Sequence, residues 1–124
     1  MRIFVSYTTR DDSINLKTLN EIYFKLSDYG EIYIDLIHND SKNKQERVLM
    51  ELDFCDLILL IETESTFESN WVRIELDRAR KLRKKVTMIR FKELMEILEK
   101  QEVSKIIDKS QLLTSAISNW GLSA

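Results

Sequence analysis

Four short apolar runs stand out along the chain, and polar residues bound each of them. They cover positions 3–5, 32–34, 56–61 and 86–89. Runs of this length that are rich in β-branched and aromatic residues are typical of strands buried on both faces. The third run is almost continuously apolar, which predicts a strand at the centre of a parallel sheet.

Helical periodicity fills the segments between these runs. Short polar side chains at 11–13 can cap the start of a helix that ends before Gly30, and two further helices are predicted over 45–54 and 70–84. Strands that alternate with helices imply βαβ units with right-handed crossovers. The pattern therefore predicts one doubly wound α/β domain over 1–124, with functional groups at the carboxyl ends of its strands.

Three other segments carry weaker patterns. The loop from Leu36 to Lys44 is polar, and His38 within it is expected to be exposed. After the fourth strand, the pattern predicts a helix over 94–98, a short edge strand at 106–107 and a final helix over 111–120. The sheet is thus expected to have four to five strands, all parallel.

The composition of the 124 residues excludes several classes of function. A net charge of -2 argues against nucleic-acid binding through a uniformly basic surface. The two glycines, Gly30 and Gly121, cannot form a glycine-rich phosphate loop. One cysteine, Cys55, excludes an internal disulfide, and a single histidine argues against a His/Cys zinc site. We therefore expect neither a metal nor a bound cofactor.

No apolar run approaches the roughly 18–20 residues that a membrane-spanning helix needs. The first seven residues turn polar too soon for a secretory signal. These features predict a cytoplasmic protein without a membrane partner.

Polar clusters follow three of the predicted strands. Ser6, Tyr7 and Thr8 come directly after the first strand, Asp35 closes the second, and residues 62–75 follow the third. Because the carboxyl ends of parallel strands meet at one edge of the sheet, these clusters are candidates for one binding site.

The third cluster carries the most specific chemistry. Trp71 and Glu75 are four residues apart, which places an indole and a carboxylate on one side of a helix. The indole can stack on a flat ring, and the carboxylate can stabilise the positive charge of an opening ribose ring during N-glycosidic cleavage. In the alternative interpretation, Trp71 anchors the core and Glu75 is an exposed helix residue. A cleft beside Tyr7 would favour an enzyme, whereas a salt bridge from Glu75 to Arg73 or Arg78 would favour a binding module.

Four segments resemble Toll/interleukin-1 receptor (TIR) domains in the right order. Residues 4–7, followed by Arg10-Asp11, are similar to the opening strand motif of that family. Residues 33–35 match its second strand, and 55–61 match its helix-to-third-strand step. Residues 65–76 resemble its segment with a serine, a tryptophan and a glutamate. Together the segments span most of the chain.

The resemblance, to the bacterial single-domain type in particular, implies a flavodoxin-like fold. This is a three-layer α/β/α sandwich with strand order 2-1-3-4-5. It also implies cleavage of NAD by an NAD glycohydrolase or ADP-ribosyl cyclase, with Glu75 catalytic and with Trp71, Tyr7 and Thr8 beside the substrate. NAD is then a substrate and not a cofactor. Ser6 and Asp35 complete the predicted substrate-binding set.

The resemblance also suggests partners. Some bacterial members act in antiphage defence, where the nucleotide product activates a separate effector protein. Family members also self-associate or pair with other TIR domains, so the alternative function is a non-enzymatic interaction or scaffold module. Two departures from the family pattern bear on these roles. The loop from Leu36 to Lys44 lacks the usual proline-glycine pair, and Thr8 and Thr9 stand where some members have arginines.

Several other features have modest interpretations. Cys55 is expected to be a buried apolar residue, not a nucleophile. The basic stretch 78–85 and an acidic patch within 93–102 are either solvated faces or a head-to-tail contact between copies. A receiver domain needs a phosphate-accepting aspartate at the end of its third strand, and Glu62 at this position excludes that class. The lack of glycine after the first strand argues against a flavin site. A nucleoside transferase of the same fold class stays open.

Overall fold

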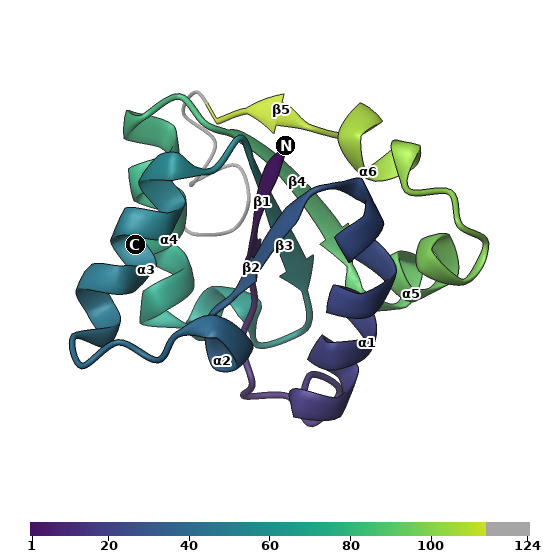
Figure 1. Ribbon diagram of the computed structural model, residues 1–124, viewed down its shortest axis with the longest axis horizontal. Helices are drawn as coiled ribbons and strands as arrows, with labels where there is room; N and C mark the ends of the chain where they lie inside the picture. Colours follow the sequence, from purple (N-terminus) through teal and green to yellow (C-terminus); the bar gives the residue numbers. More distant parts are fainter. Residues whose placement is uncertain (114–124) are drawn as a thin grey trace.

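The computed structural model describes residues 1–113, and its centre is a five-stranded sheet (Figure 1). The strands lie in the order β2-β1-β3-β4-β5. Their bounds are β1 (Arg2–Ser6), β2 (Glu31–Ile34), β3 (Leu57–Glu62), β4 (Lys85–Arg90) and β5 (Gln111–Leu112). The α/β class and the strand order are therefore confirmed.

The sheet is mixed, which corrects the prediction of a wholly parallel one. The first four strands pair in parallel, whereas β5 runs antiparallel to β4 through the pairs Lys85–Leu112 and Val86–Gln111. Parallel strands need long crossovers, and the helices between β1 and β4 supply them. The short β5 covers part of the β4 edge.

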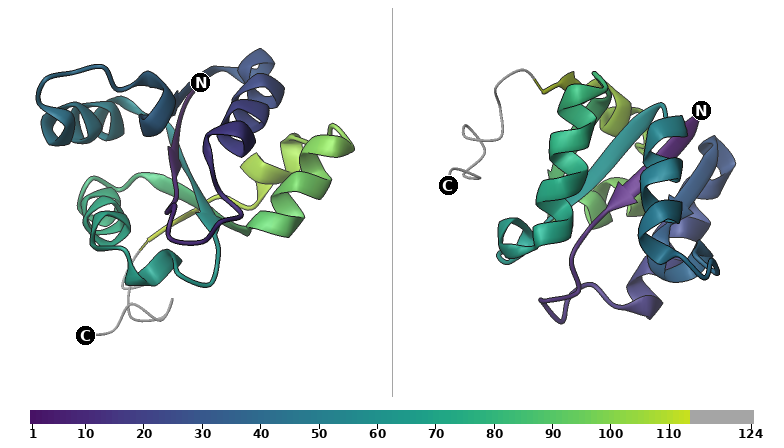
Figure 2. Two further views of the ribbon diagram at one scale, coloured as in Figure 1. Left: turned by 90° about the horizontal axis from the view of Figure 1, so that it is seen from below. Right: turned by 90° about the vertical axis from the view of Figure 1, so that its left-hand side faces the viewer.

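Helices pack against both faces of the sheet (Figure 2). One face is covered by α1 (Leu16–Leu26) and α5 (Phe91–Glu99), and the other by α3 (Lys44–Phe54) and α4 (Asn70–Lys81). Side chains that alternate along β3 divide between the two cores. Leu57, Leu59 and Ile61 face α1 and α5, whereas Ile58 and Leu60 face α3 and α4. Burial on both faces explains why this strand is almost continuously apolar.

Two helices begin or end differently from the prediction. The first starts at Leu16 because Asn15 caps it by accepting a hydrogen bond from the Thr18 amide at 3.0 Å, so residues 11–13 stay outside the helix. The fourth ends at Lys81, short of the expected position 84. Arg83 turns the chain with a φ of 55°, a left-handed conformation that ends the helix.

The loop after β2 is also more ordered than expected. A short helix, α2 (Asp35–His38), follows the strand directly. His38 is partly buried, not exposed: its Nδ1 accepts a hydrogen bond from the Ile34 amide at 2.9 Å, and its ring packs edge-on against Tyr23. Two short 3₁₀ helices, η1 (Ser27–Tyr29) and η2 (Thr66–Glu68), complete the connections.

The C-terminal part of the described chain differs most from its prediction. Residues 106–107 belong to a helix, α6 (Ser104–Asp108), and not to an edge strand. The carbonyl of Ile106 accepts a hydrogen bond from the buried Thr87 hydroxyl at 2.6 Å, which fixes this helix against β4. Residues 111–112 form β5 where a helix was expected, Leu113 lies in no helix, and positions 114–120 of that predicted helix lie outside the described residues. Within residues 1–113, no helix is long and apolar enough to cross a membrane.

Candidate functional site

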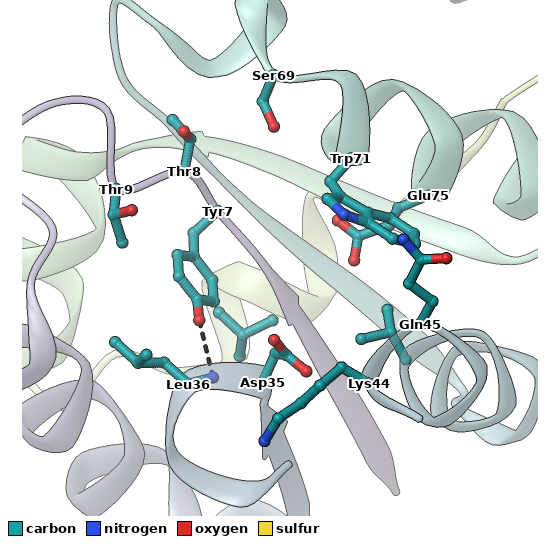
Figure 3. A pocket seen from close by; sticks show the side chains of 12 residues that line it. Tyr7, Thr8, Thr9, Asp35, Leu36, Lys44, Gln45, Ser69, Trp71 and Glu75 are labelled. Atoms are coloured by element: carbon teal, nitrogen blue, oxygen red, sulfur yellow. Dashed lines mark hydrogen bonds between the residues drawn. The ribbon is translucent and has the colours of Figure 1, made fainter. Parts of the chain in front are cut away.

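A cavity of about 330 Å³ opens at the carboxyl ends of β1 and β2 (Figure 3). Tyr7 and Thr8 reach it from the end of β1, Asp35 from the start of α2, and Trp71 and Glu75 from the first turns of α4. The topology thus brings together side chains from three separate segments, as expected for the carboxyl edge of a parallel sheet.

Glu75 is buried within this cavity wall, with 7% of its surface exposed. Its Oε1 accepts a hydrogen bond from the Ser6 hydroxyl at 3.0 Å. The two nearby arginines on α4 do not neutralise its charge, because both are engaged elsewhere. Arg73 donates to the Phe67 carbonyl, and Arg78 forms a bidentate pair with Asp53. Glu75 therefore faces the cavity as an acid without a cationic partner among the described residues.

Burial raises the pKa of Glu75 from its ordinary 4.5 to about 8. The hydrogen bond from Ser6 lowers the pKa and the charge of Asp35 raises it, but loss of water around the carboxylate is the largest cause. The carboxyl group is therefore mostly neutral at pH 7 in the free protein. A cation in the cavity would favour its ionised form.

Trp71 lies one helical turn before Glu75 and is 36% exposed at the cavity margin. The helix that carries both residues is capped by Ser69, whose hydroxyl oxygen accepts a hydrogen bond from the Val72 amide at 3.3 Å. The structural alternative for this pair is wrong in both parts, because the indole is not a core anchor and the carboxyl group is not exposed. A partly exposed indole in this position can stack on the flat ring of a ligand.

Tyr7 and Asp35 are both held in place by hydrogen bonds. The Tyr7 hydroxyl oxygen accepts from the Leu36 amide at 2.9 Å. Burial raises the pKa of Tyr7 to about 12, so the phenol stays neutral and can donate its proton. Asp35 accepts from the Tyr33 hydroxyl at 2.9 Å and from the Asn39 side-chain amide at 2.6 Å. Both side chains are therefore fixed before any ligand arrives.

The structure places five of the six predicted site residues on the cavity wall: Tyr7, Thr8, Asp35, Trp71 and Glu75. The exception is Ser6, which is 1% exposed and does not line the cavity. It was predicted to bind substrate, but its hydroxyl is used to hold Glu75. Ser6 ends β1, where side chains alternate between the two faces, so it points to the opposite side from Tyr7.

Sequence reasoning missed Lys44 and Gln45, which line the cavity from the start of α3. A usable signal was present, because a helix that follows the second strand of a parallel sheet must begin near the carboxyl edge. Asn39 connects this helix to α2, since its side-chain amide donates to the Lys44 carbonyl at 3.0 Å as well as to Asp35.

Asp11 joins two loops that carry cavity residues. Its carboxylate accepts hydrogen bonds from the Ser65 amide at 3.0 Å and from the Ser65 hydroxyl at 2.9 Å. A further hydrogen bond from the Thr63 side chain is the largest cause of a lowered pKa of Asp11. Asp11 thus connects the loop that follows Thr8 to the loop that precedes Trp71.

Replacing Asp11 with alanine is expected to loosen these two loops without unfolding the sheet. Amide hydrogen exchange over residues 63–69 should become faster, and any turnover at the cavity should fall by roughly 10-fold because the reacting groups lose alignment. Mass-spectrometric hydrogen exchange measures the first effect. Asp12→Ala, at the exposed neighbouring position, is the matched control. Unchanged exchange over 63–69 in Asp11→Ala would show that the connection is not needed.

Two other predictions concern single residues and charged stretches. Cys55 is 4% exposed, which confirms that it is a buried residue, and burial raises the pKa of its thiol to about 11. Within the basic stretch, Arg78 pairs with Asp53, and the Lys84 ammonium donates to the carbonyls of Asp53 and Cys55. Part of that stretch therefore stabilises the fold, and head-to-tail assembly stays a prediction.

Comparison with known proteins supplies no family for the chain: none of the protein-family models matches it, and none of the curated proteins matches it significantly.

Proposed function

We propose that this protein is a TIR-type enzyme with a flavodoxin-like fold that cleaves the bond between nicotinamide and ribose in NAD. The observation that supports this most directly is the buried Glu75 carboxyl group, held by Ser6 inside a cavity with Trp71 at its margin. A volume of about 330 Å³ accommodates a nucleoside-sized group. The nicotinamide riboside half of NAD is such a group.

In the proposed reaction, the cationic nicotinamide ring enters beside Trp71, and its charge favours loss of the Glu75 proton. The bond between ribose C1′ and the ring nitrogen then breaks, and both of its electrons leave with nicotinamide, which becomes neutral. The ribose is left as an oxocarbenium ion, which the Glu75 carboxylate stabilises. Water attacks C1′ and loses a proton to complete hydrolysis. In the cyclase variant, a ring nitrogen of the adenine attacks instead.

Incubation of the purified protein with NAD, followed by chromatography, tests this function. We expect nicotinamide together with ADP-ribose, a cyclic ADP-ribose or an ADP-ribose conjugate. The assay needs high protein concentrations, since the family resemblance implies that copies of the chain self-associate. No release of nicotinamide under these conditions, beside an active enzyme as a positive control, would falsify the function.

The pH dependence of kcat/KM should report the unusual pKa of Glu75. Because the ionised form stabilises the oxocarbenium ion, kcat/KM should rise about tenfold per pH unit below the pKa of about 8 and level off above it. In Ser6→Ala, the carboxylate loses its donor, so the midpoint should move upward by about one pH unit. Initial rates between pH 5.5 and 9.5 measure both midpoints, and Ser13→Ala on an exposed loop is the control. An identical midpoint in Ser6→Ala would separate Ser6 from the ionisation of Glu75.

A non-enzymatic TIR interaction module is the second candidate, and one surface observation favours it. Phe24 is 79% exposed and Leu16 is 52% exposed on the outer face of α1. Large apolar side chains that share an exposed face are typical of contact surfaces. Partners of this surface would be other TIR domains, including copies of this chain. In the enzymatic proposal, assembly and turnover coexist, and the nucleotide product activates a separate effector protein in antiphage defence.

Sedimentation of the wild-type chain and of Phe24→Ser separates these roles. Loss of assembly together with loss of turnover would show that the enzyme works as an oligomer. Assembly without any turnover would favour the scaffold.

A further inference from the structure

The charges around the cavity are unevenly distributed. Asp35 and Glu75 supply the acidic groups, and Lys44 is the one basic residue among the described residues that line it. In Figure 3, the Lys44 ammonium and the Glu75 carboxyl group lie on opposite sides of Asp35. A ligand that spans the cavity would therefore meet an acid at one end and a cation at the other.

Lys44 is positioned to use its charge on a ligand. It is exposed, and its ammonium donates one hydrogen bond to the Asn39 carbonyl. An ammonium has three donors, so two remain for an anion. Among the described residues, Lys44 forms no ion pair with a carboxylate. The nearest arginine on the same helix, Arg47, already pairs with Glu51 at 2.9 Å and lies over the Tyr33 ring.

We propose that Lys44 binds the 5′-phosphate of the ribose whose glycosidic bond faces Glu75, so that the site selects phosphorylated ribosides over free ribosides. This inference rests on the proposed function, because it takes the ribose to lie beside Glu75. Thr8 and Thr9 line the same cavity, but their hydroxyls carry no charge. An ammonium–phosphate contact is stronger than a contact to a neutral hydroxyl. Lys44 is also the first residue of α3, so the positive end of that helix adds to its charge.

Calorimetric titration with two ligands that differ only in the phosphate tests this role. The ligands are nicotinamide mononucleotide and nicotinamide riboside, and the protein is the full chain carrying Glu75→Gln, so that neither ligand is consumed. We expect the mononucleotide to bind at least about 10-fold more tightly at low salt, and this preference to shrink as salt is added.

Adding Lys44→Gln should remove the preference. The affinity for the mononucleotide should fall about 10-fold, while the affinity for the riboside should stay within about twofold of its former value. Adding Lys42→Gln, at an exposed position two residues away that does not line the cavity, should leave both affinities unchanged. If Lys44→Gln lowers the affinity for both ligands equally, or if the mononucleotide still binds more tightly in this variant, the proposed phosphate role of Lys44 is wrong.

The outcome is separable from that of the proposed function. A Lys44-dependent preference in a protein that never releases nicotinamide would support the phosphate site and reject the enzyme. Release of nicotinamide with equal kcat/KM from the two ligands by the wild-type chain would support the enzyme and reject the phosphate site. Absence of binding by both ligands would overturn the phosphate site as well.

Discussion

Glu75→Gln is expected to lower the release of nicotinamide from NAD by at least about 100-fold while the protein stays folded. Glutamine has nearly the same shape as glutamate, and its side-chain oxygen can still accept the hydrogen bond from Ser6. It cannot carry the negative charge that stabilises the oxocarbenium ion. Removal of one such electrostatic contribution from a preorganised site typically slows an enzyme by about 10²–10³-fold. Initial rates at saturating NAD, near pH 8.5, measure the loss in kcat.

Two further variants make this result specific. Glu64→Gln changes the same side chain at an exposed loop position and should keep full activity. Glu75→Asp keeps the negative charge, but its side chain is one methylene group shorter and holds the carboxylate farther from the ribose. An intermediate rate is therefore expected. Turnover by Glu75→Gln that equals the wild-type rate would remove Glu75 from the mechanism, whatever the rate of the aspartate variant.

The same Glu75→Gln change is expected to stabilise the protein at alkaline pH. Folding raises the pKa of Glu75 from 4.5 to about 8, so the folded protein holds a proton that the unfolded chain releases between these values. The free energy of unfolding of the wild-type protein therefore falls as pH rises through this window. One pKa unit contributes about 1.4 kcal/mol, so the total is on the order of 5 kcal/mol. Glutamine does not titrate and avoids this loss.

Urea denaturation at several pH values between 5 and 9 measures this effect. Near pH 5 the two proteins should differ little, and by pH 8 the variant should be more stable by a few kcal/mol. Other titrating groups, such as His38, are present in both proteins and cancel in the difference. Glu64→Gln should follow the wild-type curve. A difference that stays constant across this range would contradict the raised pKa of Glu75.

Loss of turnover together with a gain in stability at alkaline pH would show that Glu75 serves function and lowers the stability of the fold. A variant that is more stable and inactive is the usual signature of a functional group held in an unfavourable environment. If Glu75 had only a structural role, activity would survive its replacement by glutamine, whatever the change in stability.

Local pattern determined much of the fold. The apolar runs at 3–5, 32–34, 56–61 and 86–89 correspond to β1, β2, β3 and β4, whereas the strand order was expected only from the family resemblance. A run of several buried β-branched and aliphatic residues has few alternatives in a chain of this length, since each side chain must be covered on one face or the other. Helices between these strands were equally constrained by the need for crossovers.

Short segments depended on distant contacts instead. Residues 106–107 were expected to form a strand, but they lie in α6, where the Thr87 hydroxyl donates to the Ile106 carbonyl. Residues 111–112 were expected to be helical, but they pair with β4. Two to five residues carry too little periodicity to distinguish helix from strand, so the pairing partner decides.

The sequence alone determined that Trp71 and Glu75 share one side of a helix at the carboxyl edge of a sheet, because helical spacing and βαβ topology are local rules. Only the tertiary structure decided the environment of Glu75. Its hydrogen bond comes from Ser6, 69 residues away in sequence, and its raised pKa comes from burial by several elements together. Lys44 likewise reaches the cavity only because α3 begins there. Electrostatic environment depends on how much water is excluded in three dimensions, and no sequence spacing encodes that directly.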